Sequence, residues 1–236
     1  MLIRNICFAV ILSFSALWTV GCQSKGFSRA DIQEQMGRGA QTFDEKEIKD
    51  AYNKKPNLPK PFKLAVYFKR PWIGGKSPEW RWTEKDKSQF DQIAESLKAK
   101  GLLSDVFPII DSVVGEESLR GMRLAAAKHQ ADAILIIDGG AQIDRYINGW
   151  GWSYILLLPT LFVPGSKADT LFMTSAGLWD VKNEYLYATA EAEATSSDTY
   201  IAAFGERDQT LVDAAKTQAL EKLKAELEKM ILGKKL

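Results

Sequence analysis

The sequence predicts an α/β (α+β) fold, a single layered domain with a mixed β-sheet flanked by helices and a long C-terminal helix. Two observations predict it. Between residues 62 and 137, segments with the two-residue period of strands alternate with segments of helical periodicity. From residue 153 onward, three long strand-like segments follow one another before a final helical segment. This order is typical of layered domains.

The first half of the domain is expected to alternate strands and helices. Thr83 is placed to cap a helix that Gly101 ends. Pro108 cannot donate to a ladder, so its strand is expected at an edge or a bulge of the sheet. The apolar run after the second helix is typical of a buried strand. The expected elements are a strand over 62–68, a helix over 84–100, a strand over 106–110, a helix over 117–130 and a strand over 131–137.

The second half is expected to form strands over 153–163, 170–181 and 184–195, and a helix over 206–232. Small side chains on one face of the last strand allow a helix to approach closely, and the final helix carries a matching apolar stripe. The strand face consists of Leu186, Ala188, Ala190, Ala192 and Ala194, and the stripe of Val212, Ala215, Ala219, Leu223 and Met230.

The N-terminus has the pattern of a lipoprotein signal. Arg4 precedes an apolar run over 6–20, which is of signal-peptide rather than transmembrane length, and Gly21 precedes Cys22. Residues 19–22 resemble a lipobox, so we predict that 1–21 is a signal peptide and that Cys22 carries acyl chains such as palmitate. Gln23 favours sorting to the outer membrane, with the body on the periplasmic face. The alternatives are an uncleaved anchor helix and an ordinary secretory peptide cut near Gly21.

The composition of the mature chain excludes several kinds of chemistry. Cleavage removes Cys7 and leaves Cys22 as the remaining cysteine, which excludes a disulfide and a cysteine metal site. Of 31 basic and 30 acidic residues, cleavage removes Arg4, so the mature body has 30 of each. This balance argues against nucleic-acid binding. The expected organisation is a flexible tether with short helices over 22–61, capped at Ser28 and Asp44, and a globular domain over 62–236.

Several segments carry a resemblance to known families. The order of strand, helix and strand, the run 131–135, the turn 178–183 and the C-terminal helix resemble a group that includes the curli secretion lipoprotein and the outer-membrane activator of penicillin-binding proteins. Segment 154–165 and the following 180–182 resemble rhombotarget lipoproteins, although the tail 233–236 lacks that family's sorting segment. The resemblance implies an envelope lipoprotein.

Few residues form a recognisable catalytic or metal-binding pattern, so we expect no enzyme, no cofactor and no metal site. His129 is interpreted as a surface residue near a helix end. Asp138 with Gly139 and Gly140 is interpreted as a turn. The alternative, a hydrolase, pairs Asp138 with Glu191 or Glu193, which point the same way on one strand.

Two connections are rich in aromatic residues, which are frequent at protein interfaces and at the membrane–water boundary. We predict that these loops bind an envelope protein or a cell-wall component. The alternatives are that they cover the ends of the core, or that 150–173 inserts into the membrane as a hairpin. Because 155–158 is apolar on both sides, it favours a buried strand over a lipid-facing one. The predicted partner-binding residues are Trp72, Trp80 and Trp82 in one loop and Trp150, Trp152 and Tyr154 in the other.

The sequence therefore predicts a non-enzymatic outer-membrane lipoprotein that binds another envelope component. A subunit of an oligomeric export pore, which would be a homo-oligomer, is the alternative from another functional class.

Overall fold

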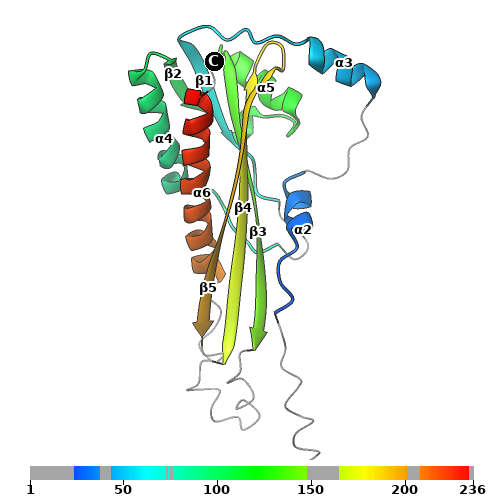
Figure 1. Ribbon diagram of the computed structural model, residues 1–236, viewed down its shortest axis with the longest axis vertical. Helices are drawn as coiled ribbons and strands as arrows, with labels where there is room; N and C mark the ends of the chain where they lie inside the picture. The colour runs from blue at the N-terminus through cyan, green and yellow to red at the C-terminus, as the bar shows by residue number, and fades with distance from the viewer. Residues whose placement is uncertain are drawn as a thin grey trace, which may run out of the picture.

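The computed structural model describes residues 24–37, 44–72, 74, 77–147, 165–200 and 208–233. Its centre is a five-stranded sheet in the order β2-β1-β3-β4-β5 (Figure 1). β1 runs parallel to β2 and β3, whereas β4 is antiparallel to both β3 and β5. This mixed sheet confirms the predicted fold class. The strands are β1 Phe62–Phe68, β2 Leu103–Pro108, β3 Ala133–Ile147, β4 Ser166–Asp180 and β5 Leu186–Tyr200.

Helices cover both faces of the sheet. α4 (Glu84–Ala99) and α6 (Asp208–Gly233) pack on one face, where their apolar side chains join those of β1, β3 and β4. α5 (Leu119–Lys128) and α2 (Arg29–Gln35) pack on the other face, at different levels along it (Figure 1). α3 (Glu45–Asn53) has no buried residue. Within the part of the chain that the structure describes, no helix is long and apolar enough to cross a membrane.

The predicted contact between the alanine face of β5 and the final helix is confirmed. Ala188 and Ala190 are buried with Leu220 and Leu223 of α6. The inward position predicted for Leu186 is wrong, since this side chain is 39% exposed. The pairing shifts between Leu178 opposite Ala188 and Trp179 opposite Leu186. This bulge changes which face the side chains at the start of β5 occupy, and Tyr187 enters the core instead.

β3 is much longer than predicted, because the turn expected at Asp138, Gly139 and Gly140 is strand interior. A Cβ at Gly139 would lie 2.9 Å from Phe172 Cζ, and one at Gly140 would lie 2.7 Å from Ile32 Cγ2. The glycines therefore allow side chains to approach the strand closely from both faces.

The segment expected to be a tether is partly docked on the sheet. Ser28 caps α2 as predicted, and Ile32 is fully buried against Leu171 and Met173. The cap predicted at Asp44 is also present, and it forms a capping box with Glu47. Residues 24–37 thus lie against the domain rather than away from it.

Most predicted element boundaries are close to those observed. Thr83 caps α4, and β2 is an edge strand, which explains the tolerance of Pro108. β2 begins at Leu103, three residues before the predicted start. The strand predicted over 153–163 lies outside the described residues.

Candidate functional site

The candidate site is a pocket at the carboxyl end of β1, between the end of α2 and the residue that precedes the cap of α5. β1 has parallel neighbours on both sides, and such strand ends are common positions for ligand sites in sheets of this kind. The pocket has a volume of about 560 Å³. It is lined by Glu34, Gln35, Gly37, Lys69, Arg70, Pro71, Trp72 and Glu117.

Lys69 joins three parts of the fold at the base of this pocket. Its Nζ lies 2.5 Å from Asp138 Oδ2 in β3 and donates to the backbone oxygen of Met36 over 3.2 Å. Both side chains of the ion pair are largely buried. The charge of Lys69 is therefore already neutralised by the protein.

Glu117, another residue of the pocket lining, holds Tyr67 and Arg70 in place. Its Oε1 accepts hydrogen bonds from the backbone N–H of Arg70 over 2.9 Å and from the hydroxyl of Tyr67 over 3.1 Å. Arg70 Nε lies 3.7 Å from the same oxygen. Burial, and secondarily the charge of Glu117, raise the pKa of Tyr67, so this hydroxyl stays a donor.

Trp72 forms the exposed rim of the pocket. Its side chain is 50% exposed, and its ring packs so closely on Gly74 that a Cβ there would lie 2.8 Å from the ring carbon Cη2. Among the predicted partner-binding residues that the structure describes, Trp72 presents most surface to solvent.

Trp80 and Trp82 occupy a different environment. Trp80 is buried, with its ring centroid 4.9 Å from those of both Trp82 and Phe172. The Trp82 indole N–H donates to the backbone oxygen of Lys69 over 2.7 Å. This arrangement matches the alternative in which the aromatic residues cover the core. The structure does not bring Trp80 to the surface with Trp72.

The remaining predicted site residues are Cys22, Trp150, Trp152 and Tyr154, and all four lie outside the described residues. The strands that flank the second aromatic loop pair up to Ile147 opposite Ser166.

Two of the three carboxylates of the hydrolase alternative form ion pairs with basic side chains. Asp138 binds Lys69, and Glu193 binds Arg29 of α2 through two hydrogen bonds, which lower the pKa of Glu193. Asp138 and Glu191 are in register across Ser175, two strand spacings or about 10 Å apart. The direct carboxylate pair that this alternative requires is absent from these strands.

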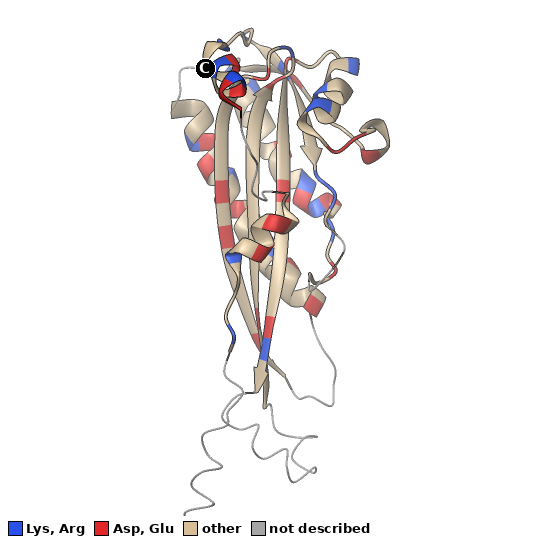
Figure 2. Cartoon of the chain, turned by 90° about the vertical axis from the view of Figure 1, so that its right-hand side faces the viewer, with Lys and Arg blue, Asp and Glu red and all other residues tan. Residues whose placement is uncertain are grey.

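His129, the other titratable residue considered in the sequence, has a structural position. His129 is exposed at the end of α5, as predicted, and contacts the ring of Phe107. No group of three or more His, Cys, Asp or Glu that could hold a metal occurs in the described parts of the chain. Basic and acidic residues are interspersed on the side of the molecule in Figure 2.

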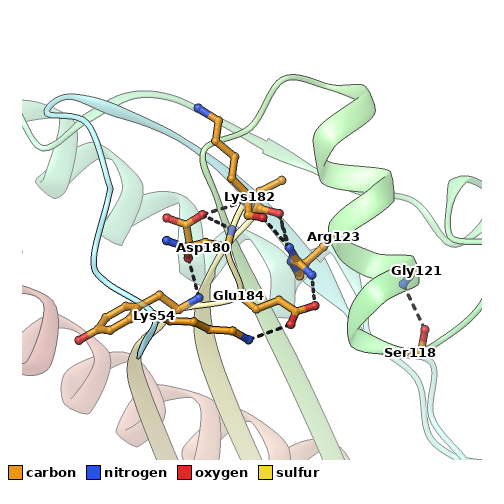
Figure 3. A network of polar contacts seen from close by, with 10 residues as sticks. Lys54, Ser118, Gly121, Arg123, Asp180, Lys182 and Glu184 are labelled. Carbon is orange, nitrogen blue, oxygen red and sulfur yellow. Dashed lines mark hydrogen bonds and ion pairs between the residues drawn. The ribbon is translucent and has the colours of Figure 1, made fainter. Parts of the chain in front are cut away.

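A polar network beside the start of β3 was not predicted from the sequence (Figure 3). Glu184 binds Arg123 of α5 and, over 2.9 Å, Lys54, while Arg123 also donates to the backbone oxygen of Val181. Glu184 has a positive φ of 64°, which marks it as a specialised turn position. The network fixes the chain that follows α3 to the turn between β4 and β5.

No protein-family model and no curated protein matches the sequence. Solved structures with a related arrangement include the hypothetical protein CT253 from Chlamydia trachomatis, at 8% identity over 73% of this chain and 99% of that one, with a TM-score of 0.40. The PelC L103M dodecamer from Paraburkholderia phytofirmans is 16% identical over 75% and 94%, with a TM-score of 0.30. Lipoprotein GNA1162 from Neisseria meningitidis is 18% identical over 67% and 97%, with a TM-score of 0.31. These similarities are too low to assign a family or a function.

Proposed function

We propose that this chain is a non-enzymatic lipoprotein, anchored in the outer membrane through acylated Cys22, that binds a cell-wall saccharide in the pocket beside Trp72. The observation that carries this proposal is the half-exposed Trp72 ring at the rim of a polar pocket. Large aromatic side chains that present an apolar surface beside hydrogen-bonding groups are characteristic of recognition sites.

The pocket chemistry favours an uncharged, polar ligand. Its lining carries two acidic residues, Glu34 and Glu117, and two basic residues, Lys69 and Arg70, and Lys69 is already paired with Asp138. With Lys69 paired to Asp138 and Arg70 beside Glu117, the exposed Glu34 leaves a net charge of −1, which disfavours an anionic ligand and is screened by solvent. A saccharide ring can pack its C–H face on Trp72 while its hydroxyl and amide groups bond to the polar lining.

Sedimentation with purified peptidoglycan sacculi tests the binding. Trp72→Ala should lower the bound fraction at least tenfold relative to the unmodified protein. Tyr52→Ala is the matched control, because Tyr52 is an aromatic residue that is 90% exposed on α3 and does not line the pocket. Sedimentation of Trp72→Ala at the unmodified level would contradict the proposal.

The same preparation separates the alternatives. Soluble saccharide fragments in the supernatant would favour the hydrolase, and a ring-sized, ion-conducting oligomer in detergent would favour the export pore. Cys22→Ser should move the protein from the membrane fraction to the soluble fraction, and an unchanged distribution would refute acylation at Cys22.

A further inference from the structure

The first described residues of the chain follow β3 towards its carboxyl end. Ser28 donates its backbone N–H to Gln142 Oε1 over 2.7 Å. Two steps further along β3, Asp144 Oδ2 accepts from Gly26 N over 3.0 Å and from Ser24 Oγ over 2.5 Å. Read from Ser28 back to Ser24, the chain therefore approaches the far end of the sheet.

α2 holds this segment firmly in place. Ile32 is fully buried and fits over Gly140, where a Cβ would collide with it. Arg29 adds hydrogen bonds of 2.9 and 2.6 Å to Glu193 of β5. The segment is thus attached to both β3 and β5, with an apolar contact between the polar ones.

The position of Ser24 limits where Cys22 can lie. A residue extends the chain by at most about 3.6 Å, so the Cα of Cys22 lies within about 7 Å of that of Ser24. Asp144 lies three residues before Ile147, the last residue of β3, which is about 10 Å of strand. The acylation point is therefore limited to within about 17 Å of the end of the sheet along the strand direction.

We infer that this end of the sheet faces the lipid bilayer, an inference that rests on the proposed acylation of Cys22. The surface, called here the sheet tip, consists of residues 24–26, 144–147, 166–169 and 198–200. The body stands close to the membrane because its docked N-terminal segment leaves no long tether between the acyl chains and the sheet tip.

The side chains at the sheet tip suit an interfacial position. Ile147 is 44% exposed. Beside it, Lys167 Nζ lies 5.6 Å from the ring centroid of Tyr146, whose hydroxyl donates to Asp169 Oδ2 over 2.8 Å. Tyrosine and lysine are enriched where proteins meet lipid headgroups. Arg145 forms an ion pair with Asp208, so its charge is balanced within the protein. Contact of the sheet tip with the bilayer therefore depends on the acyl anchor and on apolar groups rather than on net charge.

This orientation also sets how far the pocket and the network around Glu184 lie from the bilayer. Asp138, which pairs with Lys69 of the Trp72 pocket, is nine residues from the end of β3, or about 30 Å from the sheet tip along the strand. Ala133, where β3 begins, is about 45 Å from it. The pocket is therefore held above the headgroups. The network around Glu184 (Figure 3) lies beside the start of β3, at the end of the sheet away from the bilayer.

Lipid-based quenching of a site-specific label tests the orientation. The full lipoprotein is reconstituted in liposomes that contain spin-labelled phospholipid, with a fluorophore attached at Ile147→Cys or at Tyr52→Cys. Because Cys22 is acylated in the proposed mature chain, each variant has one reactive thiol. The label at position 147 should be quenched several-fold more than the label at position 52.

The outcomes distinguish the inferred orientation of the sheet tip from the proposed acylation of Cys22. Equal, weak quenching at both positions in protein that co-floats with the liposomes would overturn the orientation and leave the anchor intact. Protein that does not co-float would overturn both.

A variant of the docking contact adds a second measurement. Asp144→Ala or the milder Ser24→Ala should reduce quenching at position 147 while co-flotation is unchanged. Asp105→Ala, at an exposed residue of β2, is the control and should leave the quenching unaltered. Unchanged quenching in the Asp144 and Ser24 variants would show that these contacts do not set the orientation.

Discussion

Lys216 of α6 and Asp86 of α4 form a buried ion pair, with Nζ 2.8 Å from Oδ2 and side chains that are 1% and 3% exposed. The Asp86 carboxylate also accepts from Thr83 N in the capping box of α4. Lys216 in turn donates to the backbone oxygen of Arg81 over 2.8 Å. The pair therefore ties α6 to α4 and to the connection that carries Trp80 and Trp82.

Removing the cation should be strongly destabilising. Lys216→Ala leaves the Asp86 carboxylate buried without its partner, which typically costs about 3–5 kcal/mol. Urea unfolding measures the loss. Lys222→Ala, on the exposed side of the same helix, should change the free energy of unfolding by less than about 0.5 kcal/mol. A loss below about 1 kcal/mol for Lys216→Ala would mean that water reaches the pair.

Adding a methyl group to either glycine of β3 should also destabilise the fold. Gly139→Ala collides with Phe172 and the rings of Trp80 and Trp82, while Gly140→Ala collides with Ile32. Overpacking of this kind costs about 1–3 kcal/mol. Thermal unfolding provides the measurement, with Gly115→Ala as a control because no atom lies within 4 Å of a Cβ there. Gly140→Ala should additionally expose residues 28–37 to protease, and Gly139→Ala should not.

Stability should depend on Glu184 in a pH-dependent way. The hydrogen bond from Lys54, with the charge of Arg123, holds the pKa of Glu184 below its ordinary value of 4.5. The folded state is therefore stabilised above about pH 4.5, and this stabilisation is lost as pH falls through the lower, folded pKa. Melting temperatures of the unmodified protein and Glu184→Gln should differ at about pH 6 and converge towards about pH 3. A difference independent of pH would contradict an ionic role for this side chain.

Tyr187 should remain protonated well above the ordinary range for tyrosine. Burial, together with its bond to Asp180, raises the pKa of Tyr187 to about 12. Its hydroxyl donates to Asp180 Oδ2 over 2.8 Å and accepts from Asn57 N over 2.9 Å. Tyr187→Phe should cost about 1–3 kcal/mol, because the buried Asp180 carboxylate and the part-buried N–H of Asn57 each lose a hydrogen-bond partner. Ultraviolet titration should show one fewer late-ionising tyrosine in this variant than in the unmodified protein.

The local features of the fold could be predicted from the sequence because they depend on neighbouring residues. The caps at Ser28, Asp44 and Thr83 each need one side-chain oxygen and a backbone N–H two or three positions later. The alternating pattern of β1 and the alanine face of β5 likewise follow from a period of two. Both were found where they were expected.

The sequence by itself thus determined the class of the fold and most of its helices and strands. The tertiary structure alone decided that Gly139 and Gly140 are packing positions rather than a turn, because Ile32 and Phe172 approach them from distant parts of the chain. It likewise brought Lys69 to Asp138 and Ser24 to Asp144, over 69 and 120 residues. Such contacts depend on strand order and register, which no local pattern encodes.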